Sequence, residues 1–353
     1  MTHTYETIKL VVLRNYFILA LKIMNDSINN SNPNGNNSVN NSLNDAFSHH
    51  SATTPKKVWA VGGGKGGVGK SLMTANTSIA LAQKGFKVVA IDLDLGGANL
   101  HTCLGVGIPE KTLSDYITGK VNNLQDLAVP TPVPNLWLIS GAQDEVGIAN
   151  LKNLQKHKLV QNLSQIDADF IIMDLGAGTS QNTLDFFIAA HKGILVVLPE
   201  PTSIENAYRF IKAVFFRRLK LIEDFLEIQP LLMQAMKSRP NGQMILPSDL
   251  VSKVAELNPE MGIRLSQEIA KFKFNLIMNQ VRSAQDVEIG HSIKNVAKKY
   301  FGVEMNYIGY LEYDASVWQS IKKRRPVTLE FPNSNLVVNF KKIVNGLIQH
   351  SLS

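Results

Sequence analysis

The chain has 353 residues, of which 44% are hydrophobic, and this is enough to bury a large core in one α/β domain or in two smaller ones. Its formal net charge of +7 permits contact with nucleic acid or anionic lipid but does not require it. A single cysteine, Cys103, excludes an internal disulfide framework and a metal clip built from two cysteines of one chain, and it fits a reducing cytoplasm.

The first 56 residues are predicted to form a tail outside the folded domain. Residues 8–23 are apolar, but charged side chains interrupt them, so they fall short of the roughly 18 apolar residues of a spanning helix. No small-residue cleavage site of a secretory signal follows. We interpret this stretch as a flexible leader, with Met24 as an alternative start and an interfacial anchor as the alternative function. Residues 25–56 are rich in Asn and Ser and predict a disordered linker.

From residue 57 onward, short β-branched runs alternate with helical patterns, which predicts one domain over 57–353. Strands are expected at 57–63, 87–94, 135–141, 169–176, 193–201, 273–280 and 306–314. Helices are expected at 71–84, 151–166, 180–190, 202–226, 283–301 and 334–349, with a helical insertion at 228–270. Strands that are apolar on both faces must be covered on both sides, so we expect a doubly wound, mostly parallel sheet flanked by helices.

The turn between the first strand and the first helix matches the pattern GxxxxGK[ST]. Its glycines let successive backbone N–H groups point at phosphate oxygens, and the helix N-terminus adds positive potential. Lys70 is expected to bridge the β- and γ-phosphates of a nucleoside triphosphate, and Ser71 to hold Mg²⁺. The residues expected around the nucleotide are Gly64, Lys65, Gly66, Gly67, Val68, Gly69, Lys70, Ser71 and Leu72.

A second lysine, Lys65, stands near the start of this loop in the stretch GKGGVGKS, which resembles the deviant Walker A motif of the MinD/ParA family of ATPases. The resemblance implies that two identical subunits close face to face over two ATP molecules. It also implies that Lys65 reaches the partner's phosphates much as an arginine finger does, so that Lys65 and Lys70 are both catalytic.

Further carboxylates and glycines extend the resemblance. Asp92 and Asp94 end the second strand, at the sheet edge where ligands bind in open α/β folds. The family's first switch, DxDxGxxNL, implies that Asp94 orients the attacking water and that Asp92 lies nearer the metal. Asp174 matches Walker B and is expected to act on Mg²⁺ through a water. Gly178 matches the second-switch glycine whose N–H senses the γ-phosphate, while Gly176 replaces the proline of MinD proteins and predicts a more flexible loop.

Asn279, at the end of a later strand, matches the family's adenine-contacting asparagine. An amide can pair with the donor–acceptor edge of adenine, although an asparagine in a turn after a strand is the alternative interpretation. The sequence contains no NKxD guanine motif, which favours ATP over GTP.

Two stretches, 198–212 and 309–340, resemble the FlhG/FleN branch, which sets flagellar number and place, and MinD, which places the division site. The branch's N-terminal DQAxxLR element is not recognisable. The resemblance implies a slow, Mg²⁺-dependent, partner-stimulated ATPase that positions a cellular structure at the membrane or cell pole. It further implies a protein of the cytoplasm or of the inner face of the membrane.

Two alternatives stay open. One is a ParA-like partition ATPase that binds DNA non-specifically, and the other is a scaffold that holds ATP without hydrolysing it. Two basic clusters could serve DNA, although such runs are mostly solvated faces: Lys212, Arg217, Arg218, Lys220; and Lys322, Lys323, Arg324, Arg325. The family docks on membranes through a C-terminal amphipathic helix, but here we expect residues 334–349 to pack as ordinary core, with the anchor as the alternative.

Overall fold

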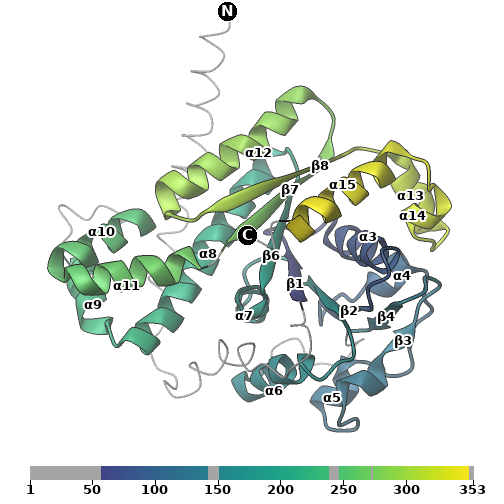
Figure 1. Ribbon diagram of the computed structural model, residues 1–353, viewed down its shortest axis with the longest axis horizontal. Coiled ribbons are helices and arrows are strands. Elements are labelled where there is room, and N and C mark those ends of the chain that lie inside the picture. The colour runs from purple at the N-terminus through teal and green to yellow at the C-terminus, as the bar shows by residue number, and fades with distance from the viewer. Residues whose placement is uncertain (1–56, 142–150, 238–245, 272, 350–353) are drawn as a thin grey trace, which may run out of the picture.

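The computed structural model describes residues 57–141, 151–237, 246–271 and 273–349, so the predicted tail over 1–56 lies outside the described residues. Figure 1 shows one sheet with helices on both of its faces. The strands are β1 (Lys57–Gly62), β2 (Val88–Leu93), β3 (Val129–Pro130), β4 (Leu136–Ile139), β5 (Phe170–Leu175), β6 (Lys192–Val197), β7 (Phe274–Val281) and β8 (Met305–Glu312). Their order across the sheet is β3-β4-β2-β5-β1-β6-β7-β8.

The predicted doubly wound sheet is confirmed. All neighbouring strands pair in parallel except β3, which pairs antiparallel with β4 at one edge. The central strands β2, β5 and β6 are buried along their whole length, as their unbroken apolar runs predicted. The edge strand β3 was not predicted, because its two residues are too short to show a pattern.

The two faces of the sheet carry separate hydrophobic cores. One core is covered by α3 (Lys70–Ala82), α4 (Leu100–Leu104), α14 (Val327–Glu330) and α15 (Asn335–Gln349). The other is covered by α5 (Leu113–Ile117), η1 (Leu124–Leu127), α6 (Asn153–Leu163), α7 (Gln181–Ala189), α8 (Pro201–Leu226), α12 (Ala284–Val296) and η2 (Ala297–Phe301). Three helices fill most of 228–270: α9 (Gln229–Lys237), α10 (Pro247–Leu257) and α11 (Pro259–Ala270). A last short helix, α13 (Ala315–Lys322), follows β8.

The C-terminal helix α15 packs on the sheet as core, as expected. Its apolar face lies against α3 and β8, while Lys341 and Lys342 face solvent. The buried side chains are Leu336, Val337, Phe340, Ile343, Val344 and Leu347. The alternative that this helix anchors the chain in a membrane is therefore wrong for the described fold, because its apolar face is already covered. Among the described helices, none combines the length and the apolar character needed to cross a bilayer.

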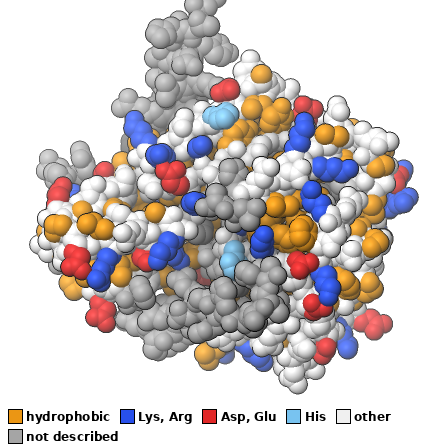
Figure 2. Space-filling view, viewed as in Figure 1, with side chains coloured by type: hydrophobic (Ala, Val, Ile, Leu, Met, Phe, Trp, Pro, Cys, Tyr) orange, Lys and Arg blue, Asp and Glu red, His pale blue; other side chains and the backbone are white. Residues whose placement is uncertain are grey.

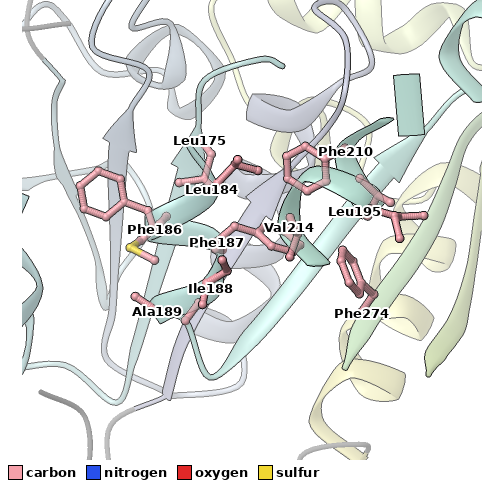
Figure 3. Close-up of a cluster of buried hydrophobic side chains, with 14 of the residues drawn as sticks. Leu175, Leu184, Phe186, Phe187, Ile188, Ala189, Leu195, Phe210, Val214 and Phe274 are labelled. Carbon is pink, nitrogen blue, oxygen red and sulfur yellow. The ribbon is translucent and has the colours of Figure 1, made fainter. Parts of the chain in front are cut away.

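Helix α7, which follows the predicted second switch, is seated by one aromatic side chain (Figure 3). Phe187 meets Phe210 of α8 edge-on at 4.9 Å between ring centroids and lies 5.4 Å from Phe274 of β7. The ring fits because two strand positions lack side chains: a Cβ at Gly193 would lie 2.5 Å from it, and one at Gly62 3.1 Å from it. A Cβ at Gly193 would force the Phe187 ring to shift, and one at Gly62 would crowd the rings of Phe187 and Phe210.

A buried ion network joins three helices on the same face. Asp185 of α7 accepts from Lys156 Nζ of α6 at 2.5 Å and from Arg217 Nε of α8 at 2.6 Å. The side chains of Lys156 and Asp185 are 3% and 2% exposed. A buried carboxylate between two cations is neutralised and hydrogen-bonded, so each partner depends on the others.

The first basic cluster is therefore not a track for DNA, and that interpretation is corrected here. Lys212 is buried, Arg217 is committed to Asp185, and Arg218 lies 3.8 Å from Glu268 with 11% of its side chain exposed. Arg217 and Arg218 are thus turned toward α7 and α11, whereas a phosphate backbone needs exposed cations. Lys220, the fourth residue of the cluster, lies 3.4 Å from Glu223 with 41% of its side chain exposed.

Replacing Asp185 with alanine is expected to lower the free energy of unfolding by about 3–5 kcal/mol, because two cations would stay buried without a counter-charge. Urea unfolding followed by circular dichroism measures this loss. Asp167→Ala is the matched control, since it removes one member of an exposed pair with Lys87 and should cost about 1 kcal/mol or less. Equal losses in the two variants would contradict a structural role for the network.

Candidate functional site

The glycine-rich loop between β1 and α3 forms an open cradle. Gly67 and Gly69 adopt positive φ angles of 77° and 95°, which residues with a side chain rarely adopt. A Cβ at Gly64 would lie 2.1 Å from the backbone oxygen of Asn206 in α8, so the loop passes directly over that helix. By contrast, nothing lies within 4 Å of a Cβ built on Gly66 or Gly67. The predicted loop thus has its tight packing on one side and free space on the other.

At the start of α3, the structure brings together Ser71 and Asp174, two of the three residues predicted to serve the metal. Asp174 at the end of β5 is fully buried, accepts a hydrogen bond from Thr74 Oγ1 at 3.2 Å and is also hydrogen-bonded by Ser71. Burial raises the pKa of Asp174 to about 8, with Asp92 adding repulsion, while Ser71, Lys70 and Thr74 act in the opposite direction. Such a carboxylate is short of positive charge, and a divalent cation beside Ser71 would supply it.

This donor set fits Mg²⁺, which keeps several waters and takes only one or two protein oxygens beside substrate phosphates. Within the described ranges, no group of three or more His, Cys, Asp or Glu side chains forms an all-protein metal cage. Lys70 is 8% exposed beside Asp174, so its charge is directed into the site.

Asp92 is occupied by its own loop. Its Oδ1 accepts from Asp94 N and its Oδ2 from Leu100 N, both at 3.0 Å. Burial raises the pKa of Asp92 to about 6, and these backbone hydrogen bonds oppose the rise. Asp92 thus orders the loop after β2, and its role at the metal stays a prediction.

Asp94 is half-buried and lies against the second predicted switch. A Cβ at Gly176 would be 3.3 Å from its Oδ1, so the residue that replaces the family's proline also lets this carboxylate approach closely. Gly178 has a φ of 82°, and its N–H donates to the carbonyl of Gly63 at 3.1 Å. The N–H predicted to sense a phosphate is therefore bonded to the loop, and a bound phosphate would compete for it.

Asn279 ties β7 to the loop. Its Nδ2 donates to the carbonyl of Val68 at 2.8 Å, and its Oδ1 accepts from Gln280 N at 2.9 Å. A Cβ at Gly69 would lie 2.4 Å from the same Nδ2. The structure thus gives this amide a supporting contact, and its pairing with adenine stays a prediction.

Lys65 points to the N-terminus of α8 in its own chain. Its Nζ lies 3.4 Å from Glu200 Oε2 and 3.1 Å from Thr202 Oγ1. The side chains of Lys65 and Glu200 are 38% and 54% exposed, and ion pairs at such a surface contribute little. Lys65 is accordingly held at the rim of the loop by contacts that are easily exchanged.

Known proteins match this chain over the same elements. The family model described as "ParA: NUBPL iron-transfer P-loop NTPase" matches residues 54–225. The antiactivator FleN of Pseudomonas aeruginosa is 29% identical over 292 residues, which cover 82% of this chain and 85% of FleN. The septum site-determining protein MinD of Helicobacter pylori is 27% identical over 252 residues, covering 70% and 91%. The chain belongs to the ParA/MinD family of P-loop NTPases.

The fold of this chain is similar to that of a solved ParA/MinD protein. The septum site-determining protein MinD from Pyrococcus horikoshii, complexed with Mg-ADP, superposes with a TM-score of 0.54 at 20% identity, covering 84% of this chain and 97% of that one. A ParA/MinD ATPase of this type binds nucleotide and Mg²⁺, and relatives named for placing the septum support a positioning role for the family.

The family description also names iron transfer, a property stated of that family and not of this chain. The one cysteine of this chain, Cys103, follows the first switch on α4, and burial raises the pKa of its thiol to about 12.

Several site residues escaped sequence reasoning. Thr74 stands one helical turn after Ser71, and this spacing was the available signal for its contact with Asp174. Glu200 and Thr202 gave no signal, because their contact with Lys65 joins distant parts of the chain. Beyond Asn279, a cavity of about 600 Å³ opens between β8 and the start of α12, and Arg282 covers the ring of Tyr313 there at 3.9 Å from its centroid.

Proposed function

We propose that this chain is an ATP-hydrolysing dimerisation switch that positions a cellular structure such as a flagellum or a division site. The placement of Lys65 supports this most directly: a second lysine stands at the rim of the phosphate cradle, half exposed and held only by surface contacts. The names of its relatives, FleN and MinD, support a positioning role.

In this proposal each residue has a separate task. Lys70 would neutralise the β- and γ-phosphates, Ser71 would hold Mg²⁺, Asp174 would act on the metal through a water, and Asp94 would orient the attacking water. The metal supplies charge neutralisation on the phosphates when it is bound. Lys65 leaves Glu200 and Thr202 and adds its charge to the partner subunit's triphosphate as the negative charge develops.

The nucleotide base is proposed to extend from the cradle toward Asn279. The cavity beside Arg282 and Tyr313 supports this direction, because it begins two residues beyond Asn279 and has a volume typical of small-molecule pockets. An aromatic ring and a guanidinium at its edge suit a flat heterocycle.

We expect the chain to double its mass when it binds ATP and Mg²⁺, and to stay single with ADP. Sedimentation velocity with a slowly hydrolysed ATP analogue measures this, and Lys70→Ala, which removes the phosphate contact, is the control that should stay single. A chain that remains single while saturated with the analogue would contradict the proposal. Phosphate release under the same conditions separates a switch from a scaffold that holds ATP without hydrolysing it.

A partition ATPase that binds DNA remains the second candidate, because the cluster over 322–325 is exposed. Salt-sensitive retention of duplex DNA that requires ATP would favour this candidate.

A further inference from the structure

Strand β7 carries a β-bulge near the end that faces the phosphate-binding loop. The pairs that Met278 and Val281 form with β8 enclose two residues of β7 but only one residue of β8. The two residues are Asn279 and Gln280, and Gln280 adopts a left-handed φ of 57°. Bulges are rare between parallel strands, and they often re-aim a side chain beside an active site. The bulge thus sets the direction of the Asn279 side chain.

The Asn279 side chain reaches the phosphate-binding loop although β6 stands between β1 and β7 in the sheet. Parallel strands end at the same edge, so the end of β7 lies beside the loop that follows β1 (Figure 1). Asn279 Nδ2 donates to the carbonyl of Val68 at 2.8 Å, and a Cβ on Gly69 would lie 2.4 Å from the same Nδ2. The amide is therefore packed against the peptide bond that joins Val68 and Gly69.

An uncharged amide suits this buried position. Figure 2 shows Lys, Arg, Asp and Glu side chains spread over the surface in view, whereas Asn279 is 4% exposed. Burying a charge without a counter-charge is costly, but an amide needs only hydrogen-bond partners. Val68 is also fixed from its other side, because its side chain is buried in the core that α3 covers. The core and the amide together hold residue 68 in one orientation.

The orientation of this peptide bond decides what the loop offers to a phosphate. In a trans peptide the C=O and the following N–H point to opposite sides. The N–H of Gly69 therefore points away from Asn279, and no hydrogen bond within the described part of the chain uses this N–H as donor. If the peptide flipped, a carbonyl oxygen would face the anionic phosphates in place of a donor. Glycine at position 69 makes such a flip easy, because glycine tolerates both signs of φ.

We propose that Asn279 is a positioning residue for the phosphates: by holding the Val68 carbonyl, it keeps the Gly69 N–H directed at the bound triphosphate. A residue that reads adenine contributes to the binding of ATP alone, whereas a residue that sets the loop contributes to the binding of any triphosphate. The effect of Asn279 is thus independent of the base. The proposal rests on the nucleotide binding of the proposed function, and it needs neither dimerisation nor hydrolysis.

Binding of Mg-ATP and of inorganic triphosphate to the full chain tests the proposal, with competition against a fluorescent ATP analogue as the measurement. Asn279→Asp keeps the size of the side chain but places an acceptor against the Val68 carbonyl. It should weaken the binding of both ligands by the same factor, about tenfold. Asn279→Ala introduces no buried charge and should weaken both by about threefold to tenfold, so it carries the test if the aspartate variant does not fold.

Asn275→Asp is the matched control, because it removes the same kind of contact at the other end of β7. Asn275 is 2% exposed, and its Nδ2 donates to the carbonyl of Gly193 at 3.2 Å. This variant should lower the free energy of unfolding as Asn279→Asp does, since each leaves a buried carbonyl without its donor. It should nevertheless bind ATP and triphosphate like the unchanged chain. Circular dichroism at the temperature of the binding measurement shows that each variant is folded.

Three results would overturn the proposal. Weaker binding of ATP with unchanged binding of triphosphate would assign Asn279 to the base. Equal losses of affinity in Asn275→Asp and Asn279→Asp would make both contacts purely structural. Unchanged binding of both ligands by the two Asn279 variants would leave the loop independent of this amide.

The measurements also separate this proposal from the dimerisation switch. If the Asn279 variants bind triphosphate normally while the unchanged chain doubles its mass with the ATP analogue, only the role of Asn279 is wrong. If Asn279 governs triphosphate binding but the unchanged chain stays single with the analogue, only the switch is wrong.

Discussion

Replacing Lys65 with alanine is expected to lower ATP turnover by about a thousandfold or more, the range of an arginine finger, while the single chain's affinity for ATP changes by less than about threefold. The structure explains why ATP turnover should fall while the affinity for ATP hardly changes. Lys65 contacts Glu200 and Thr202 at the rim of the cradle, whereas Lys70 is buried beside Asp174 at the start of α3. Phosphate release measures the turnover, and binding of a fluorescent ATP analogue to dilute protein measures the affinity.

Lys70→Ala is the comparison for this variant, because it should lose affinity and turnover together. Lys65→Ala should also fail to double its mass with the ATP analogue. Turnover by Lys65→Ala within about threefold of the unchanged chain would show that this lysine is only a solvated loop residue.

Replacing Asp94 with asparagine is expected to lower turnover by about a hundredfold to ten-thousandfold, the range for a residue that positions or deprotonates the nucleophile. Asparagine keeps the size of the side chain. Gly176, which has no Cβ, leaves room for it beside residue 94. ATP binding should persist, so the ATP-bound dimer should accumulate rather than disappear. Single-turnover hydrolysis and sedimentation velocity together measure these two effects.

Asp92→Asn is the comparison that distinguishes the role of Asp94 in hydrolysis from the role of Asp92 in ordering the loop after β2. Asp92 accepts the backbone N–H groups of Asp94 and Leu100, so its replacement should lower the free energy of unfolding. Asp94→Asn should leave that free energy nearly unchanged. If Asp94→Asn instead unfolded at markedly lower urea and kept its turnover, Asp94 would be a structural residue.

The strands of the sheet and the phosphate-binding loop could be predicted from the sequence, because each is formed by residues that follow one another in the chain. Continuous apolar runs such as β5 predict strands buried on both faces, and the glycines at 67 and 69 follow from local backbone geometry because both have positive φ angles. The placement of Ser71 beside Asp174 also followed, since a phosphate-binding loop and the neighbouring parallel strand end at the same edge.

Contacts between segments that are distant in the chain could not be predicted from the sequence. Asn279 supports the loop through Val68, and nothing in its own segment distinguishes that contact from a contact with adenine. Arg217 looked like part of a solvated basic run, but Asp185, on another helix, draws it inward. The helices α4, α5, α13 and α14 have eight residues or fewer, too short to show a helical period.

Mixing two inactive variants tests the central claim most directly. In a mixed dimer of Lys65→Ala and Asp94→Asn, the Lys65→Ala subunit keeps its own Asp94 and receives Lys65 from its neighbour, so one site is complete. Turnover should rise clearly above that of either variant alone, because each mixed dimer has one complete site. Random pairing would give about a quarter of the unchanged value, and the weaker pairing of Lys65→Ala subunits keeps the turnover of an equimolar mixture below that limit. A mixture as inactive as its components would mean that Lys65 acts within its own subunit or not at all, which contradicts the shared site.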